Sequence, residues 1–146
     1  MSTRKSKSDL GSVMVCIISP TRMILIKDES FHDARWKLPG GGIEAADAGI
    51  VAAAIREARE ETGMEFAPEE MTLRCDQRRA NGTYYPYLCL AQVSEEKLDS
   101  HQKVADENGR PIRVADFERD EVPTMLDLLE RHRQFIQNVE GNRLPE

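Results

Sequence analysis

The chain has 146 residues, of which 40% are hydrophobic and 32% charged, and its formal net charge is −6. This length suits one domain with a single hydrophobic core. The acidic balance argues against an extended nucleic-acid surface, which would be basic. No apolar run reaches the roughly 20 residues of a membrane-spanning helix. We therefore expect neither a membrane nor an extended nucleic acid among its partners.

The three cysteines are Cys16, Cys75 and Cys89. They are far apart and odd in number, and they lack the spacing of a zinc site or a disulfide framework. Reduced thiols are typical of cytosolic proteins, so we expect a cytoplasmic location. Residues 1–10 are basic but lack the apolar stretch of a signal peptide. We expect them to form a flexible N-terminus before a single domain at residues 11–146.

The first half of the chain predicts two strands and a helix. Residues 12–19 and 23–27 are rich in apolar and β-branched residues and are joined closely at Pro20, which predicts a strand pair. Residues 28–35 are polar and loop-like. The run of glycines after Pro39 predicts a break in regular structure. Apolar residues then recur at three- and four-residue spacing, which predicts a helix over residues 48–62.

The ends of this helix also carry signals. Asp47 is a candidate N-cap, and Gly63 stands where a left-handed C-cap would lie. Given 3.6 residues per turn, Glu57, Glu60 and Glu61 gather on one side, roughly 130° from the apolar stripe. We therefore expect the stripe to pack on a sheet while the three carboxylates project together toward another surface.

The second half predicts strands over residues 71–79 and 83–93, joined by a hairpin turn at Asn81-Gly82. Residues 94–110 are polar and predict a long connection. A last strand follows at residues 112–117, and an amphipathic helix at residues 124–139. Strands and helices are mixed without regular βαβ alternation, which favours an α+β fold or a layered α/β/α sandwich over a doubly wound sheet.

The acidic helix has two interpretations. Three carboxylates crowd the last turns, where the helix dipole disfavours negative charge, and only Arg56 and Arg59 are near in sequence. Arg56 and Glu60 have the four-residue spacing of an ion pair. Divalent cations would neutralise such a cluster. Alternatively, the acids form an ordinary solvated helix face.

Residues 38–64 resemble the box of the Nudix hydrolases. The second half of the box is matched completely by Arg56-Glu57-Ala58-Arg59-Glu60-Glu61-Thr62-Gly63-Met64, and the lead-in by Leu38-Pro39-Gly40-Gly41-Gly42-Ile43-Glu44. The first half departs by one residue. Asp47 or Glu44 replaces the first box glutamate in part, or that glutamate is absent. The resemblance implies a Nudix-type α/β/α sandwich with a mixed sheet between helices.

The resemblance also implies the site. Mg²⁺ or Mn²⁺ would be held by Glu57, Glu60 and Glu61, with a backbone carbonyl near Gly41. Arg56 would orient a box glutamate, and Glu60 or Glu61 would be the general base. In some relatives a carboxylate from a late loop serves instead, and the candidates here are Asp106, Glu107 and Glu118. Candidate substrate-binding residues are Gly42, Arg78, Arg79 and Tyr85.

Three hypotheses about function follow. The first is a Mg²⁺-dependent pyrophosphohydrolase, in which water attacks phosphorus in a nucleoside diphosphate derivative or a nucleoside triphosphate. The second is a catalytically silent Nudix-fold module that binds a nucleotide. The third is an α+β domain whose acidic helix is only surface. The expected partner is a small nucleotide or another diphosphate, and relatives often dimerise, which adds a homodimer to the expectations.

Overall fold

The computed structural model describes residues 10–75 and 87–140 of the chain. The strands are β1 (Ser12–Ile18), β2 (Arg22–Asp28), β3 (Gly40–Gly42), β4 (Thr72–Cys75), β5 (Tyr87–Gln92), β6 (Val104–Glu107) and β7 (Arg110–Glu118). The helices are α1 (Ile50–Thr62), α2 (Glu95–Leu98) and α3 (Glu130–Glu140), with short 3₁₀ turns η1 (Pro68–Glu70) and η2 (Val122–Thr124).

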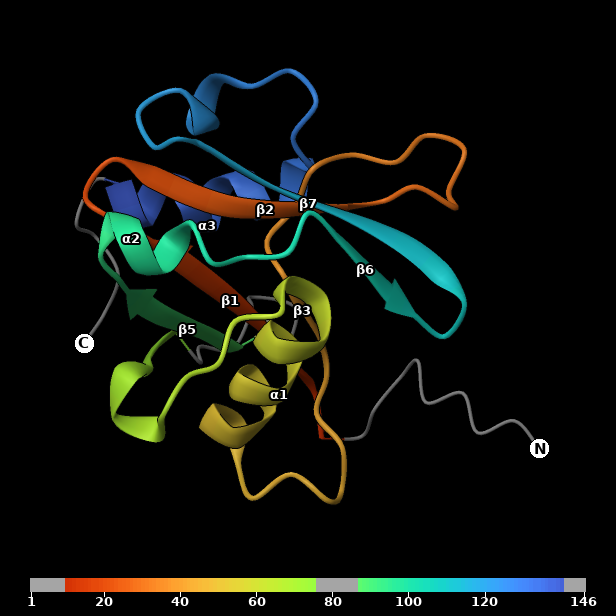
Figure 1. The fold of residues 1–146 in the computed structure, drawn as a ribbon, viewed down its shortest axis with the longest axis vertical. Helices are drawn as coiled ribbons and strands as arrows, with labels where there is room; N and C mark the ends of the chain where they lie inside the picture. Colours follow the sequence, from red (N-terminus) through yellow and green to blue (C-terminus); the bar gives the residue numbers. More distant parts are fainter. Residues whose placement is uncertain (1–9, 76–86, 141–146) are drawn as a thin grey trace, which may run out of the picture.

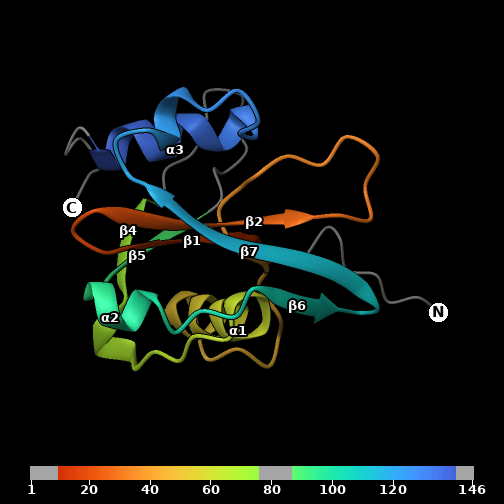
Figure 2. The same cartoon turned by 45° about the horizontal axis from the view of Figure 1, so that its top comes forward.

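The seven strands form one mixed sheet in the order β4-β5-β1-β2-β7-β6, with β3 beside β1 (Figure 1). β1 and β5 run parallel, and the other pairs are antiparallel. Helices α1 and α3 cover opposite faces of the sheet (Figure 2). The predicted α/β/α sandwich with a mixed central sheet is therefore confirmed.

Strand β1 shows why its sequence is apolar throughout. Side chains alternate across a strand, and both faces of β1 are covered. Val13, Val15 and Ile17 belong to the core cluster that contains α1 residues Ala53, Ala54 and Ala58. Met14, Cys16 and Ile18 belong to the cluster that contains α3 residues Phe135 and Ile136. A strand buried on both faces needs a continuous apolar run rather than alternation.

The prediction that the glycines after Pro39 break regular structure is wrong. Residues 40–42 do not break regular structure but form β3, which pairs antiparallel with β1. Gly40 has φ +156°, and a Cβ atom on it would overlap the Val13 carbonyl oxygen. The absence of side chains lets this strand approach its neighbour closely.

The start of α1 also differs from the prediction. The helix begins at Ile50 with Gly49 as its N-cap, and no side chain caps it. Asp47 is therefore not the cap. Gly63 does adopt the predicted left-handed conformation, with φ 76°, and its N–H donates to the Arg59 carbonyl at 3.0 Å.

The predicted connection at residues 94–110 is wrong as well, since it contains α2 and β6. Ser94 caps α2 by accepting a hydrogen bond from the Lys97 N–H at 3.0 Å. β6 pairs with β7 through a tight turn at Asn108-Gly109, where both residues have positive φ. Asn-Gly is a strong hairpin signal, so this turn could have been predicted from the sequence. The hairpin turn expected at Asn81-Gly82 lies outside the described residues.

The last helix is shorter than predicted. It begins at Glu130 rather than residue 124, because residues 122–124 form η2 around Pro123. Leu128 nevertheless packs in the α3 cluster at 1% exposure, before the helix starts. Its neighbour Leu129 donates its N–H to the Trp36 carbonyl at 2.8 Å. The apolar residues of the amphipathic helix predicted at 124–139 therefore come partly from α3 and partly from the segment before it.

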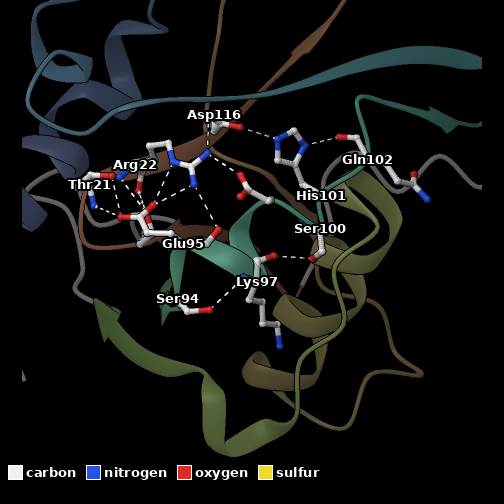
Figure 3. Close-up of polar contacts among 11 residues, drawn as sticks. Thr21, Arg22, Ser94, Glu95, Lys97, Ser100, His101, Gln102 and Asp116 are labelled. Atoms are coloured by element: carbon white, nitrogen blue, oxygen red, sulfur yellow. Dashed lines mark hydrogen bonds and ion pairs between the residues drawn. The ribbon is translucent and has the colours of Figure 1, made fainter.

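A polar network fixes α2 against the sheet (Figure 3). The Arg22 guanidinium on β2 contacts the carboxylates of Glu95 at 3.1 Å, Asp99 at 2.8 Å and Asp116 at 3.3 Å. Asp116 on β7 also contacts His101 Nε2 at 2.9 Å. The network anchors the segment that leads from α2 into β6.

Two further expectations concern the whole chain. Cys16 and Cys89 are buried thiols outside any disulfide, in agreement with reduced cysteines, while the side chain of Cys75 lies outside the described part. In residues 10–75 and 87–140 no helix is long and apolar enough to cross a membrane.

Candidate functional site

The candidate site lies where β3 meets α1. A Cβ atom on Gly41 would overlap the carboxylate of Glu57, so the backbone of β3 lies directly against that side chain. Gly40 donates its N–H to Glu61 Oε1 at 2.8 Å. The glycines therefore serve the site in two ways: Gly41 leaves room for the Glu57 carboxylate, and Gly40 presents a backbone donor to Glu61.

Glu57 and Glu61 are buried, with exposures of 4% and 3%. The expectation that the three carboxylates project together away from the core is wrong for this pair, and only Glu60 is exposed. Glu57 Oε2 contacts Arg56 Nη1 at 3.2 Å, but Glu57 Oε1 is buried and has no hydrogen-bond partner among residues 10–75 and 87–140. Buried polar atoms are almost always paired in native proteins, so this oxygen marks a place for a further ligand.

Burial changes the acidity of both groups. It raises the pKa of Glu57 to about 7, with the Glu107 and Glu60 charges adding to the effect and the Arg56 charge opposing it. Burial also raises the pKa of Glu61 well above its usual value, and the charges of Glu57 and Glu107 raise it further. The Arg56 charge therefore offsets the effect of burial on Glu57 only in part.

Glu107 completes the cluster from the end of β6. One carboxylate oxygen from each of Glu57, Glu60 and Glu107 lies within 4.8 Å of the other two. Of the three late acids considered as candidates, Glu107 is thus brought to the helix. Asp106 is exposed on the opposite face of β6, and Glu118 lies at the far end of β7, opposite Arg22.

Arg56 connects the glycine strand to the acids. It donates from Nε and Nη2 to the two carboxylate oxygens of Asp47, both at 2.9 Å, and from Nη2 to the Gly42 carbonyl at 2.9 Å. The predicted pair with Glu60 is present at 3.2 Å. Glu44 approaches Arg56 only to 3.6 Å. Of the two acids proposed for the first box position, Asp47 makes the close, two-pronged contact.

The donor set fits a divalent cation. Mg²⁺ and Mn²⁺ prefer carboxylate and carbonyl oxygens. The cluster offers three carboxylates, and one of them, that of Glu57, has a buried oxygen without a partner in the described residues. The same arrangement would be costly as a purely structural feature, because buried charges need partners. Of the other predicted site residues, Arg78, Arg79 and Tyr85 lie outside the described part of the chain.

Comparison with known proteins agrees with the resemblance to the Nudix hydrolases. A family model described as NUDIX domain matches residues 10–139. A Nudix hydrolase structure from Nitrosomonas europaea aligns with a TM-score of 0.65 at 24% identity, covering 92% of this chain and 90% of that one. The NUDIX domain of Shewanella oneidensis NrtR, solved with ADP ribose, aligns with a TM-score of 0.68 at 20% identity, covering 97% and 93%.

A third structure, a MutT/nudix family protein from Enterococcus faecalis, aligns with a TM-score of 0.57 at 20% identity. The alignment covers 73% of this chain but only 42% of that longer protein. A comparison with curated protein sequences found no match.

Proposed function

This chain belongs to the Nudix hydrolase family, and from that premise we propose that it hydrolyses a diphosphate linkage in a nucleoside diphosphate derivative. One observation carries the proposal: the buried Glu57 and Glu61 meet Glu60 and Glu107 against the backbone of a glycine strand. The ADP ribose bound by the NrtR domain supports a nucleotide derivative as the ligand class.

We propose that Glu57, Glu60 and Glu107 hold Mg²⁺ or Mn²⁺, because their oxygens converge. When bound, such a cation lowers the pKa of a coordinated water and offsets charge on phosphate oxygens. The roles of Glu61 and of the Gly41 carbonyl as further ligands remain predictions of the family resemblance. Arg56 contributes by fixing Glu57 and Glu60 relative to β3.

Glu61 is our choice for the proton acceptor. Its Oε1 accepts a hydrogen bond from the Gly40 N–H, which fixes the carboxylate beside Glu107. Burial raises its pKa, and a base with a raised pKa takes up a proton more readily near neutral pH. Glu60 is the other candidate from the sequence, but its side chain is 42% exposed and no backbone donor fixes it in the described part of the chain.

A hydrolysis screen tests the proposal. Nucleoside triphosphates, ADP ribose, dinucleoside polyphosphates and nucleotide sugars would be incubated with the protein, with and without Mg²⁺. We expect Mg²⁺-dependent turnover of at least one class. Glu57→Gln and Glu61→Gln should each lower the rate by more than about tenfold, whereas Glu65→Gln, an exposed acid beyond the helix, should not.

The outcomes separate the hypotheses. Metal and nucleotide binding without turnover would favour the silent module, and failure to bind metal at all would contradict the proposed metal site. Wild-type rates in both glutamine variants would contradict the proposal. Cytoplasmic residence and a homodimer remain predictions, which fractionation and light scattering would check.

A further inference from the structure

A cavity of about 250 Å³ lies beside the proposed site, between the segment joining β2 to β3 and the start of α3. That segment and α3 lie on the same side of the sheet (Figure 2). Hydrogen bonds between Trp36 and the backbone just before α3 hold them together. Phe31 and Leu129 contribute apolar surface to the lining. This volume takes part of a ligand rather than a whole nucleotide.

Three cations converge on this cavity: Arg35, Lys37 and Arg131. Arg35 Nη1 reaches only the Leu126 carbonyl, at 3.3 Å. Neither the Lys37 ammonium nor the Arg131 guanidinium forms an ion pair with any residue in 10–75 or 87–140. In a protein with a net charge of −6, a cavity whose three cations outnumber its two acids, Asp28 and Asp33, favours an anionic ligand.

The two acids in the lining do not cancel these charges. Asp28 is already engaged, because its Oδ2 contacts Arg110 Nη1 at 2.7 Å and its Oδ1 accepts from Ser30. Asp33 is exposed, where water screens its charge. Lys37 shares the charge of Asp28 with Arg110, so the cations around the cavity still exceed the acids.

Arg110 links the cavity to the carboxylate cluster. Its Nη2 lies 3.4 Å from Glu107 Oε1, and its Nη1 contacts Asp28 in the cavity wall. Its guanidinium carbon also lies 5.9 Å from the centre of the Phe31 ring. Arg110 thus connects the wall of the cavity at Asp28 to the carboxylate cluster at Glu107.

We propose that this cavity binds a second anionic group, a phosphate ester or a carboxylate, on the part of the substrate beyond the diphosphate. The inference rests on the proposed function for the orientation of the substrate. It goes beyond that function because it predicts a preference within the class: diphosphates that carry a further anion bind better than the same molecules without it. Lys37 and Arg131 would be the residues that set this preference.

Matched ligand pairs test the proposal by equilibrium binding to the Glu61→Gln variant with Mg²⁺ present, so that the cation can hold the diphosphate while turnover is slowed. NADPH and NADH differ by one phosphate ester, and UDP-glucuronate and UDP-glucose differ by one carboxylate. We expect the more anionic member of at least one pair to bind at least about tenfold tighter. The pair that responds identifies the anion as phosphate or carboxylate.

The double variant Lys37→Gln/Arg131→Gln should reduce that ratio to below about threefold, with its fold checked by circular dichroism. Arg113→Gln, which removes an exposed cation on β7 outside the cavity, should leave the ratio unchanged. If the double variant does not fold, the two single variants replace it, and each should lower the ratio. Equal affinities within both pairs, no measurable binding of any member, or a ratio that survives the substitutions would overturn the proposal.

Hydrolysis of the same ligands with Mg²⁺ keeps the two proposals apart. A binding preference without turnover would support the anionic cavity and contradict the proposed activity. Turnover without any preference would support the activity and reject the cavity's role.

Discussion

At the scale of single residues, the glycines and the carboxylates determine each other's identity. Gly41 has no side chain because the Glu57 carboxylate occupies the space where a Cβ atom would be. Gly40 allows β3 to approach β1 and gives its N–H to Glu61. The family resemblance implied that Gly41 contacts a metal and Gly42 a substrate. In the structure, Gly40 and Gly41 lie directly against Glu61 and Glu57.

Gly41→Ala should disturb the carboxylate cluster more than the fold. The new methyl group would push the Glu57 carboxylate out of its position, and the end of a flexible side chain can move without large backbone changes. We expect the affinity for Mg²⁺ to fall by about tenfold or more, measured by isothermal titration. An unchanged affinity would show that Glu57 is not held in place by β3.

Asp47 and Glu44 offer a matched comparison at the first box position. Asp47 pairs with Arg56 through both oxygens, and this contact lowers the pKa of the Asp47 carboxyl. Removing one partner of a charge-assisted hydrogen bond costs about 2 kcal/mol. Asp47→Ala should therefore lower the free energy of unfolding by about 2 kcal/mol, whereas Glu44→Ala should change it little, because Glu44 is exposed. Denaturant titration of both variants would decide which acid occupies the position.

At the scale of elements, His132 joins α3 to the segment before β3. Its Nδ1 accepts a hydrogen bond from the Leu38 N–H at 3.0 Å, so the ring must be neutral at that nitrogen. Burial, together with the positive charges of Arg131 and Lys37, lowers the pKa of His132 to about 4. The ring therefore holds the start of the Gly-rich strand against α3 only while it is unprotonated.

This geometry predicts a pH-dependent stability. Since the pKa of His132 falls from 6.5 in the unfolded chain to about 4 in the folded one, the unfolded chain binds more protons between these values. Its contribution to stability is complete above pH 6.5 and is lost as the pH falls toward 4. The loss reaches about 3 kcal/mol, at about 1.4 kcal/mol for each pKa unit.

His132→Asn supplies the control, because an amide oxygen can accept the Leu38 N–H without titrating. Denaturant titrations between pH 4 and 7 should show a steeper loss of stability in the wild type than in this variant. Parallel curves would mean that the buried ring does not resist protonation.

Arg22 has a similar role for α2, since it contacts acids from α2, the following segment and β7. In Arg22→Gln these carboxylates lose their shared cation, and we expect amide hydrogens in residues 95–101 to exchange about tenfold faster. Hydrogen-exchange mass spectrometry would measure this. Lys103→Gln, an exposed lysine just beyond the network, should leave the exchange rates unchanged.

At the scale of the whole molecule, the acidic cluster should link metal binding to stability. Burial of Glu57 and Glu61 raises their pKa values, so a cation that compensates their charge favours the folded state. A ligand present at about 100 times its Kd stabilises a protein by about 2.7 kcal/mol. Saturating Mg²⁺ should thus raise the melting temperature above that in EDTA, and Glu57→Gln should reduce the increase. Equal shifts in both proteins would place metal binding elsewhere.

Much of this molecule follows from local patterns in the chain. The apolar and β-branched residues at 12–19 predicted a strand, and β1 forms there. The spacing of Glu57, Glu60 and Glu61 predicted that their carboxylates gather on one helix, and Gly63 marked where that helix ends. These features depend on the residue and its near neighbours, which is why the sequence is sufficient to predict them.

The tertiary structure alone decided the features that depend on distant contacts. The sequence offered Asp106, Glu107 and Glu118 equally, but the pairing of β6 with β7 brings Glu107 to the cluster. Asp47 was predicted to cap the helix, but its carboxylate pairs with Arg56 instead. Burial of two of the three carboxylates also depends on β3 lying against α1. Periodicity specifies which face of a helix a side chain occupies, whereas only the packed chain determines what that face meets.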